Sequence, residues 1–343
     1  MRKSLDPAIG FRREWTHPDI HLIPTFICVG RYIGLIAVGD AFCRGEGRAM
    51  FLLDGRVRER DDKQFGIEVD ATDSSARFTR FGGQLLEWQT RADAPVLWLS
   101  DAAVFDDIAP IRGGVPVCWP WFGDDAGRPG WPKHGFARTR KWQLDKADDE
   151  GDEIVLRFSL PRQEQEAEYW PHATRPTLLC RVGACLTIEL ITTNVDRQPI
   201  TFTEALHAYF RVHDIETSTI AGLEDTAYFD QLTQIDCPAQ GRPLQVREET
   251  DRIYRNLSRP IALYDAGFQR TIMIEHEGAR DAIVWNPWIE KSARLGDMGP
   301  GDAYRRMMCI ETGTVGAQPV VLQPGQTHTL RMKISVDDLS ADD

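Results

Sequence analysis

Two residues of the chain have side chains suited to moving a proton in opposite directions. Glu311 ends the apolar run Met307–Ile310, where an ionised carboxylate is costly to bury unless it is paired or functional. His207 lies in Leu206–His213, whose period of two separates an apolar face from a face of histidine, tyrosine and arginine. A carboxylate and an imidazole can act as general base and general acid near neutral pH. Taken alone, each pattern fits a solvent-facing strand residue equally well.

Two further stretches suit a phosphorylated sugar. Arg112–Gly123 joins a guanidinium to a glycine pair and several aromatic residues; arginine binds phosphate through parallel hydrogen bonds, and aromatic faces stack on sugar rings. Lys133–Lys141, which contains His134 and Arg138, is the densest positive stretch of the chain. On physical grounds the first stretch is as consistent with core packing as with sugar phosphate binding. The second stretch, considered by itself, favours a solvated basic surface. Asp251, considered by itself, is typical of an aspartate that caps a turn before a strand.

Strands are the elements expected to position these side chains. Short alternating or β-rich runs are separated by glycine, proline, aspartate and asparagine, with neither alternating helices nor a long repeat. The pattern predicts an all-β fold, one large antiparallel sandwich over residues 61–340. Leu186–Asn194, Thr201–Val212 and Met307–Glu311 are among the predicted strands.

Other stretches of the chain have no such pattern. Residues 1–60 lack a sustained period and are predicted to be an N-terminal extension, either upstream of the fold or a regulatory arm. Arg112–Arg140 and Lys291–Arg306 are predicted to be long functional loops. Ile20–Ala41 is too interrupted by glycines, a proline and an arginine to span a membrane.

The composition limits the partners. The net charge of −12 argues against nucleic acid, and a phosphorylated substrate would need a local basic cluster. Seven cysteines without CxxC spacing indicate reduced thiols of a cytoplasmic protein. The chain has no GxGxxG opening a helix, no P-loop, no HExxH and no GxSxG, and its eight histidines lack clustered ligand spacing. The sequence therefore predicts neither a metal nor an organic cofactor.

In this order along the chain, the segments together resemble the aldose 1-epimerase superfamily, and specifically its hexose-6-phosphate branch. The resemblance covers about residues 65–336, and Arg112–Gly123 is its most specific motif. The matching stretches are Val96–Ser100, Arg112–Gly123, His134–Arg138, Thr201–Val212, Asp251–Tyr254, Val284–Trp288 and Tyr304–Glu311. The loop Gly296–Asp302 departs from the family, whose members commonly have an acidic run there.

The resemblance implies a large antiparallel β supersandwich that holds a sugar in a concave cleft. By position, His207 matches the family's general acid and Glu311 its general base. Removing the C1 hydroxyl proton while the ring oxygen gains one opens the sugar ring, and closure after rotation about C1–C2 gives the other anomer. We expect the nearby carboxylate to raise the pKa of the histidine and so to favour its acid form.

The same resemblance implies the residues that bind the substrate. Arg112 matches an arginine that contacts the substrate through its phosphate, and Asp251 matches a carboxylate that binds sugar hydroxyls. His134 and Arg138 fall in a segment that lines the same cleft. The expected partner is a small sugar phosphate, without nucleic acid or membrane, bound by a monomer.

Two alternatives stay open. An aldose 1-epimerase acting on unphosphorylated sugars would need the same His207 and Glu311 but no phosphate clamp. A non-catalytic carbohydrate-binding protein could keep the fold and the cleft. The presence of both a matched acid and a matched base argues against the second alternative, because binding alone requires neither.

Overall fold

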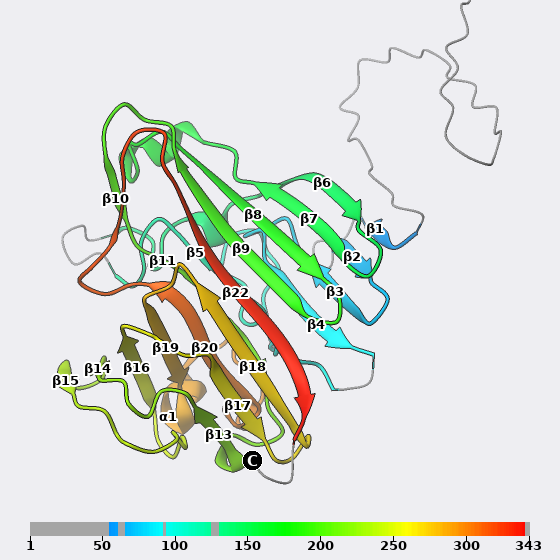
Figure 1. Ribbon diagram of the computed structural model, residues 1–343, viewed down its shortest axis with the longest axis vertical. Coiled ribbons are helices and arrows are strands. Elements are labelled where there is room, and N and C mark those ends of the chain that lie inside the picture. The colour runs from blue at the N-terminus through cyan, green and yellow to red at the C-terminus, as the bar shows by residue number, and fades with distance from the viewer. Residues whose placement is uncertain (1–54, 61–65, 92–93, 125–129, 340–343) are drawn as a thin grey trace, which may run out of the picture. The chain divides into compact units, whose positions relative to one another are not determined.

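The structure is a computed structural model of the chain, and it describes residues 55–60, 66–91, 94–124 and 130–339 (Figure 1). All of them belong to one compact unit, Ala49–Asp343. Two eight-stranded sheets, one four-stranded sheet and one two-stranded sheet make up most of this unit, and the strand pairs within them are antiparallel. The predicted all-β antiparallel sandwich is therefore confirmed.

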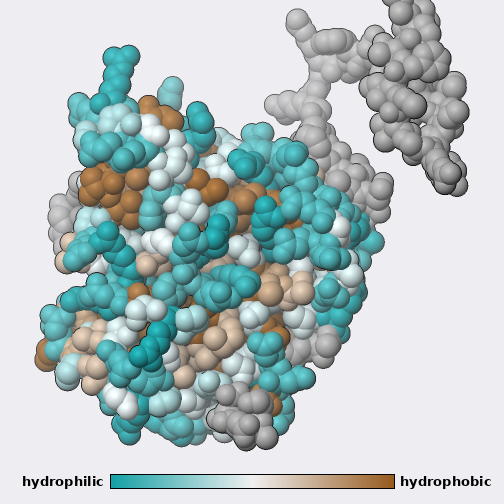
Figure 2. Space-filling model, viewed as in Figure 1, coloured by the Kyte–Doolittle hydropathy of each residue, from teal (hydrophilic) through white to brown (hydrophobic). Residues whose placement is uncertain are grey.

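One eight-stranded sheet has the strand order β13-β17-β18-β22-β9-β8-β7-β6. Its strands are β6 (Gln143–Asp149), β7 (Ile154–Ser159), β8 (Thr174–Val182), β9 (Leu186–Asn194), β13 (Ser218–Ala221), β17 (Ile261–Asp265), β18 (Arg270–Glu277) and β22 (Thr327–Asp338). Figure 2 shows a mainly hydrophilic surface over β8, β9 and β22, where ion pairs join Arg331 to Glu189 and Lys333 to Glu275. This sheet thus has one solvated face and one core face.

The second eight-stranded sheet has the order β15-β14-β16-β19-β20-β11-β5, and β12 also pairs with β20. Its strands are β5 (Val117–Cys118), β11 (Glu204–Leu206), β12 (Tyr209–Arg211), β14 (Tyr228–Asp230), β15 (Ile235–Cys237), β16 (Thr250–Arg255), β19 (Asp281–Asn286) and β20 (Met307–Thr314). Along β20, Met308 and Ile310 join the core cluster that also contains residues of the first sheet. Met307 and Cys309 point the other way, into a separate buried cluster with Trp98. This sheet is therefore covered on both faces.

The remaining elements are short. The small sheets consist of β1 (Val57–Glu59), β2 (Ile67–Asp70), β3 (Ser74–Phe78), β4 (Leu85–Thr90), β10 (Ile200–Phe202) and β21 (Val320–Leu322). The helices are α1 (Trp288–Arg294) and the 3₁₀ turns η1 (Ala137–Thr139), η2 (Glu164–Glu168), η3 (Ile215–Thr217) and η4 (Ala303–Arg306). Within the described residues, no helix is long and apolar enough to cross a membrane.

Three predictions from the sequence need correction. Thr201–Val212 is not one strand but three, β10, β11 and β12, because the backbone N–H groups of Thr203, His207 and Tyr209 donate to Pro120, Pro116 and Gly114 instead. Arg112–Arg140 is not all loop, since it contains β5 and η1, and neither is Lys291–Arg306, which begins inside α1 and ends in η4. The predicted extension lies mostly outside the described residues, although β1 falls within its last few positions.

Candidate active site

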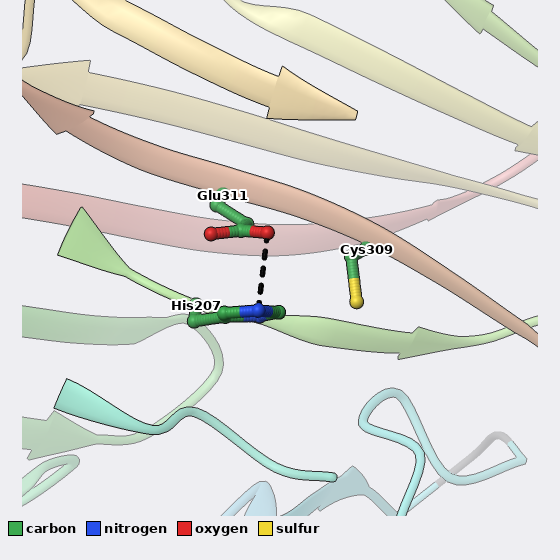
Figure 3. A group of neighbouring side chains, drawn as sticks. All are labelled: His207, Cys309 and Glu311. Atoms are coloured by element: carbon green, nitrogen blue, oxygen red, sulfur yellow. Dashed lines mark ion pairs between the residues drawn. The ribbon is translucent and has the colours of Figure 1, made fainter. Parts of the chain in front are cut away.

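His207 faces Glu311 because two short strands share one register against β20. β11 pairs with β20 as far as Thr312, and β12 resumes the pairing at Cys309 in the same register. His207 and Glu311 lie between these pairs, and residues opposite one another on neighbouring strands have adjacent side chains. Nε2 of His207 lies 3.2 Å from Oε1 of Glu311, within ion-pair distance (Figure 3).

Burial shifts the pKa values of both residues of this pair. His207 is 7% exposed and Glu311 is 1% exposed. Burial lowers the pKa of His207 well below its usual value, and the charges of Arg138 and Arg112 lower it further. Burial also raises the pKa of Glu311 well above its usual value, and the Asp251 carboxylate adds to the rise. The expected rise in the histidine pKa is therefore wrong, and the two groups titrate as a coupled pair.

Tyr209 connects the pair to Arg112. Its ring stacks on that of His207, and its hydroxyl accepts a hydrogen bond of 3.0 Å from Nη1 of Arg112. Nε of Arg112 donates to Asp297 at 3.1 Å, and the guanidinium carbon lies 5.9 Å from the centre of the Trp285 ring. The arginine is thus oriented before any ligand arrives, which lowers the entropy cost of binding.

His134 sits in a turn that requires glycine beside it. Its backbone N–H donates to the carbonyl of Gly123 at 2.8 Å, and its Nδ1 accepts from the Gly123 N–H at 3.1 Å. Gly135 has φ of +73°, and a Cβ there would lie 2.0 Å from the Trp119 carbonyl oxygen. Burial lowers the pKa of His134, so the ring is neutral and its proton is on Nε2. This histidine can donate a hydrogen bond to a ligand.

Asp251 approaches the same region from β16. It pairs with Trp285 of β19 in the sheet, and its Oδ1 accepts a hydrogen bond from Nε2 of Gln231. Burial raises the pKa of Asp251, whereas the charge of Lys291 on α1 lowers it. Lys291 itself forms an ion pair of 2.8 Å with Glu249. The carboxylate is therefore held by one amide and lies in the field of two cations, Lys291 and Lys133.

All these groups surround one cavity of about 300 Å³, a size that suits a single small molecule. The lining residues are Arg112, Phe122, Gly123, Asp124, Lys133, His134, Arg138, His207, Gln231, Asp251, Ile283, Trp285, Lys291, Leu295 and Glu311. All six residues predicted from the sequence line this one cavity: His207, Glu311, Arg112, Asp251, His134 and Arg138. The structure brings these six residues together.

Positive charge is concentrated in the cavity although the chain is acidic. Arg112, Lys133, Arg138 and Lys291 all line it. Nη2 of Arg138 donates to the Lys133 carbonyl at 2.8 Å, and the buried Nε of Arg138 has no hydrogen-bond partner within the part of the chain that the structure describes. Lys133 is partly exposed and lies 3.4 Å from Asp124. Such a group of cations is the local basic cluster that an anionic ligand requires.

Sequence reasoning missed several lining residues. Lys133 belongs to the basic stretch Lys133–Lys141, so the sequence could have predicted it as a residue that binds an anion. Gln231 lies in an unremarkable polar turn and gave no signal. Lys291 reaches the cavity from a helix of only seven residues, too short to show a helical period. Asp297, which orients Arg112, comes from the loop that departs from the family pattern.

The antiparallel sandwich is the fold of solved galactose mutarotase-like proteins. A family model described as Aldose 1-epimerase matches residues 67–335. The chain belongs to the aldose 1-epimerase family.

Two bacterial proteins that are similar to the chain have the same name. Proteins of Escherichia coli K12 and Salmonella typhimurium LT2, both called "Putative glucose-6-phosphate 1-epimerase", are 34% and 36% identical to it. The matches cover 79% and 74% of this chain and 90% and 84% of those proteins. The crystal structure of a "putative mutarotase" from Salmonella typhimurium is 31% identical, with a TM-score of 0.75, and the match covers 82% of this chain and 96% of that one.

Proposed function

We propose that the protein interconverts the α and β anomers of a hexose 6-phosphate, with His207 and Glu311 as its acid–base pair. The observation that supports this most is the distance of 3.2 Å between Nε2 and Oε1 in a cavity lined by cations. The ring oxygen and the C1 hydroxyl oxygen of a sugar are bonded to the same carbon, so a matched acid and base must lie close together. The names of the similar bacterial proteins agree with this substrate.

In the proposed reaction His207 is protonated and Glu311 is ionised when the sugar is bound. Glu311 takes the proton of the C1 hydroxyl while the bond between C1 and the ring oxygen breaks, and His207 gives a proton to that oxygen. The product is the open-chain aldehyde. After rotation about C1–C2, the two residues reverse their roles and close the ring as the other anomer. The reaction neither oxidises nor reduces the sugar.

The phosphate is proposed to bind Arg112, Lys133 and Arg138. These cations line the cavity, and Arg138 has a buried N–H without a partner in the described chain. Arginine and lysine form charge-assisted hydrogen bonds with phosphate oxygens. A bound phosphate would also offset the positive charge that lowers the pKa of His207. The phosphorylated substrate would thus favour the acid form of the histidine that it needs.

Asp251 and His134 are proposed to bind sugar hydroxyl groups. A carboxylate accepts hydrogen bonds from hydroxyls, and the Nε2–H of His134 can donate one. Both side chains line the cavity. The Trp285 ring, which also lines it, offers an apolar face to the sugar.

The test compares two sugars and two proteins. Conversion of freshly dissolved α-glucose 6-phosphate and α-glucose would be followed by NMR exchange or polarimetry with wild type and His207→Ala. Much greater acceleration of the phosphate than of glucose, lost in the variant, is the expected result. Equal acceleration of both sugars would assign an aldose 1-epimerase without phosphate preference, and no acceleration of either would leave a carbohydrate-binding protein.

A further inference from the structure

The proposed catalytic pair has a third neighbour that acid–base chemistry does not use. Sγ of Cys309 and the ligand atoms of His207 and Glu311 all lie within 4.8 Å of one another, and all three residues are buried (Figure 3). Cys309 and Glu311 are two positions apart on β20, so their side chains leave the same face of the sheet. The thiol thus completes a set of one nitrogen, one sulfur and one oxygen donor.

We propose that His207, Cys309 and Glu311 bind a thiophilic divalent cation, with Zn²⁺ as the best fit, and that the bound ion blocks mutarotation. Imidazole, thiolate and carboxylate are the ligands that Zn²⁺ uses, and three protein ligands leave one tetrahedral position open. His207 and Glu311 line the cavity, so the open position would face it. Donors around tetrahedral zinc are roughly 3.3–3.8 Å apart for bonds of about 2.0–2.3 Å. A side-chain shift on the order of 1 Å therefore completes the site.

Unsatisfied polar atoms support a ligand at this position. Oε2 of Glu311 and Nδ1 of His207 are buried, and neither has a hydrogen-bond partner among the residues that the structure describes. Buried polar atoms are normally paired, and an unpaired carboxylate oxygen in a buried site favours a cation. The observation is independent of the spacing of the three donors.

The surrounding charges determine which cation fits. Arg112 and Arg138 oppose any positive ion in the cavity, so binding must come from coordination bonds rather than from the field. Mg²⁺ and Ca²⁺ prefer oxygen ligands and gain little from a thiol. Zn²⁺ binds thiolate, neutral imidazole and carboxylate, so its binding would release the protons that these three side chains carry.

Competition for the same two side chains links the metal to the reaction. The proposed ring opening needs His207 and Glu311 free to exchange protons with the sugar, and a metal bound to both groups occupies them. The inhibition therefore rests on the proposed function, whereas metal binding itself does not. The two parts can be measured separately.

Metal binding is tested with Co²⁺, which replaces Zn²⁺ in tetrahedral sites and gives a near-ultraviolet band when a thiolate binds it. We expect wild type to bind one more equivalent of thiolate-ligated Co²⁺ than Cys309→Ala or Cys309→Ser. The matched control is Cys118→Ala, because Cys118 is equally buried on neighbouring β5 but lies outside the group. Equal bands in wild type and both Cys309 variants, with folding verified by circular dichroism, would overturn the proposal.

Inhibition is tested by measuring anomer exchange at increasing Zn²⁺ concentrations. Without added metal, Cys309→Ala is expected to keep its activity, because the thiol has no part in the proton transfer. Losing one ligand should raise the Zn²⁺ concentration for half-inhibition by about tenfold or more. Chelation should restore wild-type activity, and Mg²⁺ should have no effect. Equal sensitivity of Cys309→Ala and wild type would refute the site, whereas an inactive wild type would refute the proposed function and leave the Co²⁺ result valid.

Discussion

The rings of His207 and Tyr209 lie nearly parallel, with centroids 4.8 Å apart and 7° between their planes. The tyrosine hydroxyl also accepts the 3.0 Å hydrogen bond from Arg112. Tyr209 therefore joins the proposed acid to the proposed phosphate ligand through two separable contacts, one of the ring and one of the hydroxyl.

The two contacts predict different kinetic losses. Tyr209→Phe keeps the stack and removes the hydroxyl, so KM for the hexose phosphate should rise by about fivefold to tenfold with kcat nearly unchanged. Tyr209→Leu removes both contacts and should lower kcat as well. Steady-state kinetics on glucose 6-phosphate would measure both variants. A Tyr209→Phe variant that loses kcat alone would contradict this division.

Removing a cation of the basic cluster should weaken the binding of the phosphorylated sugar only. Lys133→Ala and Arg138→Ala should each raise KM for glucose 6-phosphate by about tenfold or more, because hydrogen bonds to charged groups contribute about 1.5–3 kcal/mol. Activity on unphosphorylated glucose should not fall. Lys141→Ala is the matched control, since Lys141 pairs with Asp107 and does not line the cavity. Equal losses on both sugars would argue against a phosphate site.

Glu311→Gln should stabilise the protein while abolishing activity. Because burial raises the pKa of Glu311, the folded protein binds this proton more tightly than the unfolded chain, and the associated stability is lost as pH rises through the folded pKa. Glutamine is neutral at every pH, so the variant should unfold about 2 °C or more higher near pH 8 and equally near pH 4. Calorimetry in the presence of a chelator measures the difference. A lower melting temperature near pH 8 would show that the imidazole stabilises the carboxylate as an ion pair.

The amide of Gln231 predicts a loss confined to binding. Gln231→Leu removes the hydrogen bond to Oδ1 of Asp251, so the carboxylate should be less well oriented toward sugar hydroxyls. We expect KM to rise by about fivefold with kcat retained, since one hydrogen bond contributes about 1 kcal/mol. Gln240→Leu, which changes an exposed residue outside the cavity, is the control. A fall in kcat as large as the change in KM would assign Gln231 to the reaction itself.

Local patterns sufficed for the sandwich but not for its irregular strands. Leu186–Asn194 was predicted with the bounds that β9 has, because its nine residues follow the alternation of a half-buried strand. The run Thr201–Val212 looked just as regular, yet it breaks at Thr203 and again at His207 and Ala208. The breaks depend on hydrogen bonds to Pro120, Pro116 and Gly114, roughly eighty to ninety-five residues earlier in the chain. No local pattern reports such a contact.

The residues of the candidate site also differ in whether the sequence could predict them. His207, Glu311 and Arg112 were predicted as site residues because they match positions of the aldose 1-epimerase family. Their local sequence patterns are equally consistent with residues that have no function. Gln231 and Asp297 act through single hydrogen bonds to other site residues, and they come from a turn and a loop of ordinary composition. The depressed pKa of the histidine also depends on burial and on cations brought near by folding, which a sequence does not display.

The shared register of β11 and β12 against β20 also determines what can be redesigned. Deleting Ile310 while Cys309 keeps its partner Tyr209 would turn Glu311 toward the main core and bring Thr312 to face His207. The turns and loops that supply Lys133, Gln231 and Asp297 are subject to no such constraint. Exchanging those segments should therefore change which sugar the protein accepts as substrate, while the strands that hold His207 and Glu311 stay the same.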